Sequence, residues 1–77
     1  RFLEFHPTAN FLLSTGLDGS SWLVNYRTGV SRVFTKPMGA TIDQIVFSRS
    51  GHLVAIRSSH GIDLLSFPEG DQLHRIQ

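Results

Sequence analysis

The sequence predicts an all-β protein made of two copies of a four-stranded antiparallel unit. Ile, Leu, Val and Phe occupy 25 of the 77 positions, whereas Ala, Glu and Lys occupy six, and this balance favours strands over helices. The chain also aligns with itself at an offset of 42 residues, which indicates an internal repeat. Every 11-residue window with a helical apolar stripe is interrupted by Gly or Pro, so a helical interpretation fails.

The first unit contains four runs of strand-forming residues separated by turn residues. The runs cover residues 2–5, 11–15, 20–25 and 30–35. The dipeptide Asp18-Gly19 supplies the positive φ that a tight turn requires, and Gly29 closes the next turn. Connections this short indicate antiparallel hairpins, because a parallel crossover needs about a dozen residues or more.

The second unit repeats this order of strands and turns. Its runs cover residues 43–47, 53–57, 62–67 and 72–76. The 42-residue offset matches Phe5 with Phe47 and Leu23 with Leu65. An offset of 41 instead matches Val24 with Leu65, so a one-residue slip is expected in a turn between the strands, where it costs least.

Residues 1–36 therefore form the first predicted unit, 37–42 the connection and 43–77 the second unit. The runs 11–13 and 53–56 are continuously apolar, which predicts strands that are covered on both faces. We expect Trp22 to lie in the core between neighbouring units, and an anchor for a binding partner is the alternative.

Four segments carry a resemblance to a known family, namely LEFHP at 3–7, IVFS at 45–48, LDG at 17–19 and LVNYRTG at 23–29. In these segments the two units resemble the WD40 family of β-propellers, and the resemblance covers almost the whole chain. It implies that each unit is one four-stranded blade of a larger ring, which typically holds 4–8 blades. Two blades do not close such a ring, so it also implies a longer parent chain, an assembly of copies or a partner chain. The chain starts without Met, inside an apolar segment, as expected for a piece of something longer.

The units depart from the family pattern at its best-known positions. Val24-Asn25 and Leu65-Ser66 stand where the family has Trp-Asp, and no Gly-His pair precedes either first strand. The polar network of typical blades is therefore expected to be absent. Apolar packing between the blades would hold the structure instead.

Neither a metal site nor a cofactor site is predicted. The sequence has no Cys, and His6, His52, His60 and His74 are separated by 46, 8 and 14 positions, which fits no local zinc pattern. His6 and His52 lie in turns, where bonding to nearby backbone is the simpler role.

No catalytic site is predicted either. Ser58, Ser59, His60 and Asp63 include the residue types of a nucleophilic triad, but they lie within six positions of one another. A working triad takes its side chains from separate elements, and no Gly-x-Ser-x-Gly elbow occurs. An enzyme is accordingly the weakest of three interpretations.

The charge pattern keeps a nucleic-acid partner as the alternative. The net charge is +1 and the basic residues are scattered, without a stacking motif among them. An RNA-processing or other nucleic-acid-associated propeller remains open because further blades could supply charge. The apolar runs are too short to span a membrane, and the lack of Cys and of a signal sequence favours an intracellular protein.

The resemblance implies a noncatalytic scaffold for protein–protein interactions in a multisubunit assembly. In that family, partners usually dock where the turns after the second strands and the connections between blades meet. This face would hold Asp18, Lys36, Met38, Arg57 and His60 as partner-binding residues, with Lys36 and Met38 exposed on a flexible Gly/Pro loop. Other proteins, further blades or copies of this chain are the expected partners, and solvated loops without a partner remain the alternative.

Overall fold

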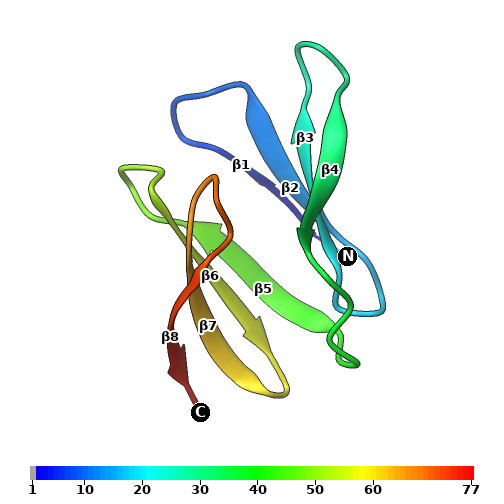
Figure 1. Ribbon diagram of the computed structural model, residues 1–77, viewed down its shortest axis with the longest axis vertical. Helices are drawn as coiled ribbons and strands as arrows, with labels where there is room; N and C mark the ends of the chain where they lie inside the picture. Colours follow the sequence, from blue (N-terminus) through cyan, green and yellow to red (C-terminus); the bar gives the residue numbers. More distant parts are fainter. Residues whose placement is uncertain (1) are drawn as a thin grey trace.

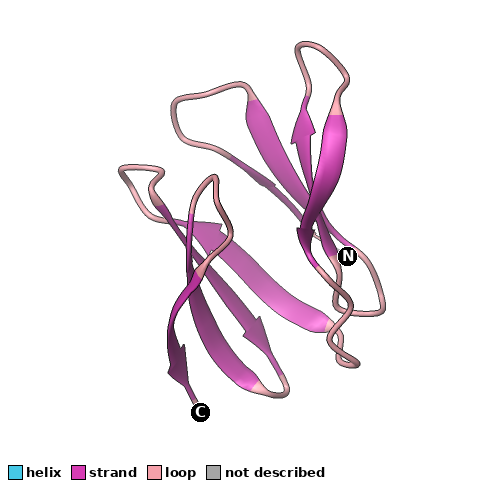
Figure 2. Ribbon diagram, viewed as in Figure 1, coloured by secondary structure: helices cyan, strands magenta, loops and turns pink. Residues whose placement is uncertain are grey.

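The computed structural model describes residues 2–77, and within this range it contains eight strands and no helix (Figure 2). The strands are β1 (Leu3–Phe5), β2 (Phe11–Thr15), β3 (Ser21–Asn25), β4 (Ser31–Thr35), β5 (Ile42–Phe47), β6 (Leu53–Ser58), β7 (Gly61–Ser66) and β8 (Gln72–Ile76). Each predicted strand is present, and its ends lie within one residue of the prediction.

The strands form two four-stranded sheets (Figure 1). Sheet A has the order β1-β2-β3-β4 and sheet B the order β5-β6-β7-β8, and every pair of neighbours is antiparallel. The predicted all-β class and its division into two antiparallel four-stranded units are confirmed.

The two sheets repeat each other in the details of their turns. The amide of Gly29 donates to the carbonyl of Asn25 at 2.8 Å, and the amide of Gly70 donates to the carbonyl of Ser66 at 2.9 Å. Both glycines have positive φ, 81° and 82°, a conformation that glycine adopts without steric cost. The same residue type therefore closes the same turn in each half.

Strand pairing locates the one-residue slip in the repeat. Leu13 pairs with Leu23 in sheet A, and its repeat counterpart Ala55 pairs with Leu64 in sheet B. The third strands therefore match at an offset of 41, and the alignment of Leu23 with Leu65 is wrong. The difference lies in the turn between the second and third strands, which is longer in sheet A than in sheet B.

The core lies between the sheets and is built mainly from aliphatic and phenylalanine side chains. Sheet A and sheet B together contribute Leu13, Leu23, Phe34, Ile42, Ile45, Phe47, Val54, Ile56, Leu65 and Phe67. Phe67 joins the two sheets, since its ring centroid lies 6.0 Å from Phe11, 5.8 Å from Phe34 and 4.9 Å from Phe47. Burying each large apolar side chain contributes about 1.5–3 kcal/mol to the stability of this arrangement.

The first strands of the two sheets contact each other more than any other pair of strands from different sheets. The last strands, β4 and β8, lie at separate edges of the molecule (Figure 1). The sheets thus diverge from their first strands toward their last.

His6 fastens the first turn of sheet A to sheet B. Its Nδ1 accepts hydrogen bonds from the amides of Thr8 at 3.1 Å and Ala9 at 2.9 Å, so the predicted bonding to local backbone is confirmed. An Nδ1 that accepts carries no proton, which leaves Nε2–H to donate to the Gly51 carbonyl oxygen at 3.0 Å. The ring also packs edge-on against Phe47 at 5.0 Å.

Candidate interaction surfaces

The predicted partner-binding residues lie at one end of the molecule. Figure 1 shows the β2–β3 turn, the connection from β4 to β5 and the β6–β7 turn together at its lower end. These segments carry Asp18, then Lys36 and Met38, then His60, while Arg57 lies near the lower end of β6. We call this end of the molecule, formed by the three segments and the last residues of β6, the lower end.

Asp18 organises the β2–β3 turn. Its Oδ1 accepts hydrogen bonds from the Ser20 hydroxyl at 2.6 Å and from the Ser20 amide at 3.0 Å. The hydroxyl bond, followed by the amide bond, holds the pKa of the Asp18 carboxyl below its ordinary value. The Asp18 carbonyl accepts from the Met38 amide at 3.2 Å, which ties the turn to the connection between the sheets.

Met38 is half-buried and packs against the core, so the expectation that it is exposed is wrong. The physical reason is the close approach of the connection to the β2–β3 turn. A side chain at Gly19, which has φ of 86°, would meet the Met38 Cγ at 2.5 Å. Lys36 is exposed, as expected.

Arg57 and His60 line one open hollow of about 490 Å³ at the end of sheet B, together with Ser58, Ser59 and Ile62 among others. Both side chains are exposed. The structure therefore brings four of the five predicted residues together in two pairs, Asp18 with Met38 and Arg57 with His60. Lys36 lies on the same connection as Met38.

A second surface, which the sequence did not single out for binding, is the face of sheet A that points away from sheet B. Cross-strand pairing places Ser14 beside Trp22 and Trp22 beside Val33 on this face, with Leu3 and Phe5 along β1. The exposed fractions are 63% for Leu3, 59% for Phe5 and 43% for Trp22. Trp22 therefore does not lie in the core between these two sheets, because its side chain is on the opposite face of β3 from Leu23.

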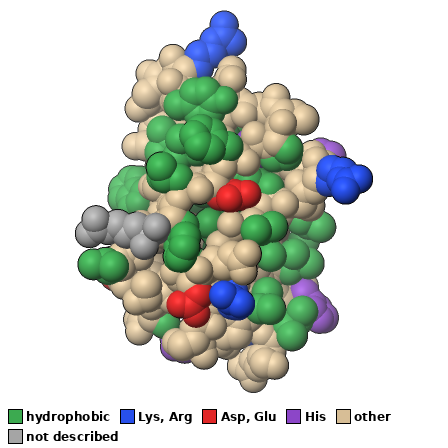
Figure 3. All heavy atoms as spheres, turned by 180° about the vertical axis from the view of Figure 1, so that it is seen from behind, with side chains coloured by type: hydrophobic (Ala, Val, Ile, Leu, Met, Phe, Trp, Pro, Cys, Tyr) green, Lys and Arg blue, Asp and Glu red, His purple; other side chains and the backbone are tan. Residues whose placement is uncertain are grey.

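The far face of sheet B is also uncovered and mostly apolar. It carries a hollow of about 270 Å³ lined by Gln44, Val46, Ala55, Arg57 and Ile62. Seen from behind, hydrophobic side chains are visible at the surface over both sheets (Figure 3). The continuous apolar runs at 11–13 and 53–56 are thus covered on one face and only partly shielded on the other.

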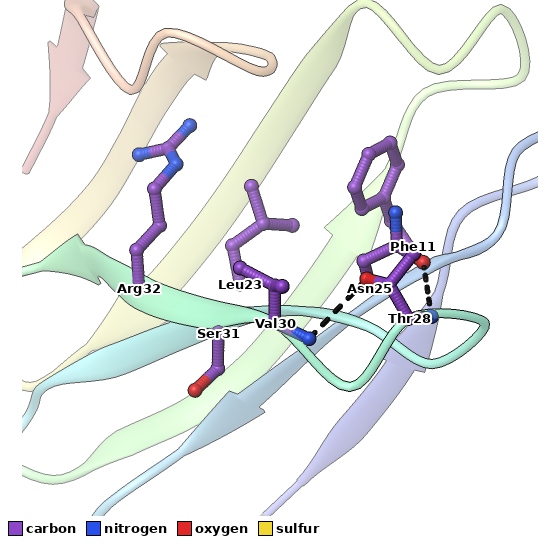
Figure 4. Close-up of a pocket in the computed structure, with 7 residues that line it drawn as sticks. All are labelled: Phe11, Leu23, Asn25, Thr28, Val30, Ser31 and Arg32. Carbon is purple, nitrogen blue, oxygen red and sulfur yellow. Dashed lines mark hydrogen bonds between the residues drawn. The ribbon is translucent and has the colours of Figure 1, made fainter.

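A third hollow, of about 310 Å³, lies on the covered side of sheet A beside the β3–β4 turn (Figure 4). Figure 4 shows Phe11, Leu23 and Arg32 rising from one side of the sheet while Ser31 points to the other. Arg32 donates from Nη2 to the Pro68 carbonyl at 2.7 Å, so its guanidinium spans the gap to sheet B. The hollow is lined by residues of sheet A and its β3–β4 turn, and it brings no reactive groups together.

The residues of the conceivable triad do not form one. The Ser58 hydroxyl accepts from the backbone amide of His60 at 3.1 Å, and within residues 2–77 no hydrogen bond joins the His60 ring to Ser58 or Asp63. Asp63 instead lies 3.5 Å from the Nε of Arg75, and its buried Oδ1 makes no hydrogen bond. The contact is an ion pair without hydrogen-bond geometry.

The described part of the chain holds no cluster of three or more His, Asp or Glu side chains placed to bind a metal ion. Within the same residues, no helix has the length and apolar character needed to cross a bilayer.

No family model matches this chain, and no curated protein matches it. The resemblance to WD40 propellers therefore rests on the residues of the sequence.

Proposed function

We propose that this chain is a noncatalytic protein–protein interaction scaffold, in which the two sheets are adjacent blades of a WD40-like propeller within a multisubunit assembly. Partner proteins bind at the lower end, where the exposed side chains of Lys36, Arg57 and His60 lie on the connection between the sheets, at the end of β6 and in the β6–β7 turn. The hydrogen bonds of Asp18 and of the Met38 amide position the β2–β3 turn and the connection.

The observation that carries the proposal is that turns at the lower end are held by hydrogen bonds while one apolar face of each sheet is uncovered. Hydrogen bonds from the Ser20 hydroxyl to the Asp18 carboxylate and from the Met38 amide to the Asp18 carbonyl restrain the β2–β3 turn and the connection, which lowers the entropy that a partner must remove on binding there. At the same time each sheet leaves one apolar face uncovered, and surfaces of this kind are typical of proteins that bind other proteins.

The nucleic-acid alternative has less support from the same structure. Arg32 donates to a backbone carbonyl of sheet B, and Arg75 is paired with Asp63 and donates to the His60 carbonyl at 3.1 Å. The net charge of the chain is only +1. Phosphate binding needs several free cationic side chains that converge on one face.

The test is protein capture with a matched pair of triple variants. The first replaces Lys36, Arg57 and His60 with serine. The second replaces two arginines and a histidine at the opposite end with serine, namely Arg27, Arg49 and His52, which are equally exposed. Each immobilised protein is incubated with an extract of the cells that produce it, and the bound proteins are quantified by mass spectrometry.

We expect the unmodified chain and the opposite-end variant to retain one set of proteins that the lower-end variant loses. Retention should be the same at about 50 and 200 mM salt and after nuclease treatment, since phosphate binding would weaken steeply over that range. Equal capture by all three chains contradicts the proposed site. Capture that disappears with salt or nuclease favours the nucleic-acid alternative.

A further inference from the structure

The two sheets pack with unlike faces together. We define the front face of sheet B as the one that meets sheet A. Its side chains are Ile45, Phe47, Val54, Ile56, Asp63 and Leu65, none of them more than 9% exposed. The back face of sheet A, which receives them, carries Leu13, Leu23 and Phe34. The front of one unit thus lies on the back of the other.

The repeat identifies the corresponding front face of sheet A. Strand pairing matches the six buried positions of sheet B with Leu3, Phe5, Leu12, Ser14, Trp22 and Val24 of sheet A. Five of these six side chains are apolar, yet this face meets nothing in residues 2–77. Leu3 is 63% exposed, whereas its counterpart Ile45 is 3% exposed. The uncovered front of sheet A therefore has the pattern of a surface that is buried in its own repeat.

The back face of sheet B is uncovered in the same way. Ala55 and Leu64 occupy the positions that Leu13 and Leu23 occupy on the covered back of sheet A. Around Ala55 lies the hollow of about 270 Å³. The uncovered faces of the two-sheet stack are therefore the front of sheet A and the back of sheet B. These are the same two kinds of face that meet in the interface between sheets A and B.

We propose that the front face of sheet A is a docking surface for the back face of sheet B of a second copy of this chain. The partner is a second copy because the contact between sheets A and B is itself a front-to-back contact between two copies of one unit. The proposal rests on the proposed function in naming a partner for that scaffold. It concerns the faces of the sheets, and only Arg57 belongs both to the back face of sheet B and to the lower end.

Trp22 is the anchor of this contact. It is the largest exposed side chain on the front face, and aromatic anchors that fill a partner's hollow dominate protein interfaces. The hollow on the back of sheet B is apolar at Val46, Ala55 and Ile62, and Arg57 at its edge can lie over an indole ring. Docking buries Trp22 against these side chains.

A front-to-back contact is heterologous, so each copy retains one free front and one free back. Such contacts close into rings where the rotation between units permits, and otherwise they continue as filaments. With two sheets in each copy, a ring of about 4–8 blades holds two to four copies.

The experiment measures association of the 77-residue chain by sedimentation velocity over a dilution series, together with its intrinsic fluorescence. Trp22 is the only tryptophan, so its emission reports on the front face alone. We expect a concentration-dependent increase in mass, accompanied by a blue shift of the emission as Trp22 leaves water. A chain that stays monomeric with unchanged emission at protein concentrations up to about 1 mM overturns the proposal, because its dissociation constant would then be weaker than about 1 mM.

Two single variants test the direction of the contact. Trp22→Lys charges the front of sheet A and Val46→Lys charges the back of sheet B, and both side chains point away from the core between the sheets. Each variant alone should associate at least about 30-fold more weakly than the unmodified chain, the loss expected at an interface anchor. An equimolar mixture should form a one-to-one dimer, because the intact back of the first fits the intact front of the second.

The control is Val30→Lys, which places the same charge at a position 67% exposed and outside both faces, and it should associate like the unmodified chain. Circular dichroism establishes that each variant retains its strands. If either variant loses them, Val33→Lys replaces the front-face variant and Ile62→Lys the back-face variant.

Two results overturn the docking of front on back. One is a mixture that stays monomeric, and the other is a dimer of the Val46→Lys variant alone, which would mean that two fronts bind each other. Open-ended growth of the unmodified chain, suppressed by both variants, supports the docking surfaces and contradicts the closed propeller of the proposed function. Failure of the two proposals can therefore be told apart.

Discussion

Replacement of His6 by alanine tests how the first turn of sheet A is fastened to sheet B. The change removes the hydrogen bond to the Gly51 carbonyl and the bond from the Ala9 amide, each contributing about 1 kcal/mol. The bond from the exposed Thr8 amide is replaced by water at little cost. Loss of the ring contacts with Phe47 at 5.0 Å and with Phe67 at 5.1 Å adds about 1 kcal/mol. We expect the free energy of unfolding to fall by about 3 kcal/mol.

Two further substitutions separate the functions of the imidazole. His6→Asn places an oxygen near the position of Nδ1 and keeps the bonds within the turn, but it does not reach Gly51. His6→Gln places an amide nitrogen near the position of Nε2 and keeps only the bond between the sheets. Each variant should recover about 1 kcal/mol of the loss seen with alanine, because each retains one buried hydrogen bond.

Urea unfolding followed by far-ultraviolet circular dichroism measures these differences, at one protein concentration because association would change the apparent stability. With a slope of about 1 kcal/mol per molar urea, a 3 kcal/mol loss shifts the midpoint by about 3 M. If His6→Ala leaves no folded baseline, the asparagine and glutamine variants still rank the two hydrogen bonds. A shift of less than about 0.5 M for His6→Ala would refute the fastening role, since that is within the effect of an ordinary surface change.

Three further predictions concern the turns and the core. Gly19→Ala should destabilise the fold by at least about 2 kcal/mol more than Gly29→Ala in thermal unfolding. Both glycines have positive φ, but only at Gly19 does an added Cβ overlap neighbouring atoms. Equal losses of stability would show that backbone strain alone matters. Ser20→Ala should raise the carboxyl pKa of Asp18 toward its ordinary value in a carbon-13 NMR titration. Since the pKa of Asp18 is depressed in the folded state, its carboxylate stabilises the fold above about pH 4, and this stabilisation is lost as pH falls through the folded-state pKa. Ser20→Ala should therefore lose less stability on acidification than the unmodified chain. An unchanged titration of Asp18 contradicts the role given to the Ser20 hydroxyl. Asp63→Val should raise the urea midpoint by the equivalent of about 1 kcal/mol, because it removes a buried oxygen that lacks a hydrogen bond, and a lower midpoint would mean that the ion pair outweighs this cost.

The strands and their order could be predicted because the apolar runs are short and the turn residues are unambiguous. The runs at 11–15 and 72–76 match β2 and β8 with the same bounds. The slip between the repeats is expected in a turn, because strand pairing tolerates no extra residue without a bulge whereas a turn does. The structure places it there.

The coverage of each face could not be predicted in the same way. A run such as Phe11-Leu12-Leu13 indicates apolar surroundings on both sides but does not say which side is covered within this chain. The size and apolar character of Trp22 predict a core position, but its side chain lies on the open face of sheet A. The burial of Met38 escaped prediction because it depends on a contact between the β2–β3 turn and the connection, which are not adjacent in the sequence.

The difference between the two front faces is itself informative. Strand pairing matches Trp22 of sheet A with Asp63 of sheet B. The covered front of sheet B thus holds a carboxylate with an unsatisfied oxygen, while the uncovered front of sheet A holds a tryptophan 43% exposed at the same position. At the matched pair of Ser14 and Ile56 the polar side chain is instead on sheet A, so each front carries five apolar side chains out of six. Burial of apolar area stabilises, and two faces of equal apolar content are expected to gain alike from being covered. Only the front of sheet B is covered within residues 2–77, and the equal apolar content of the front of sheet A is what the docking of a second copy there requires.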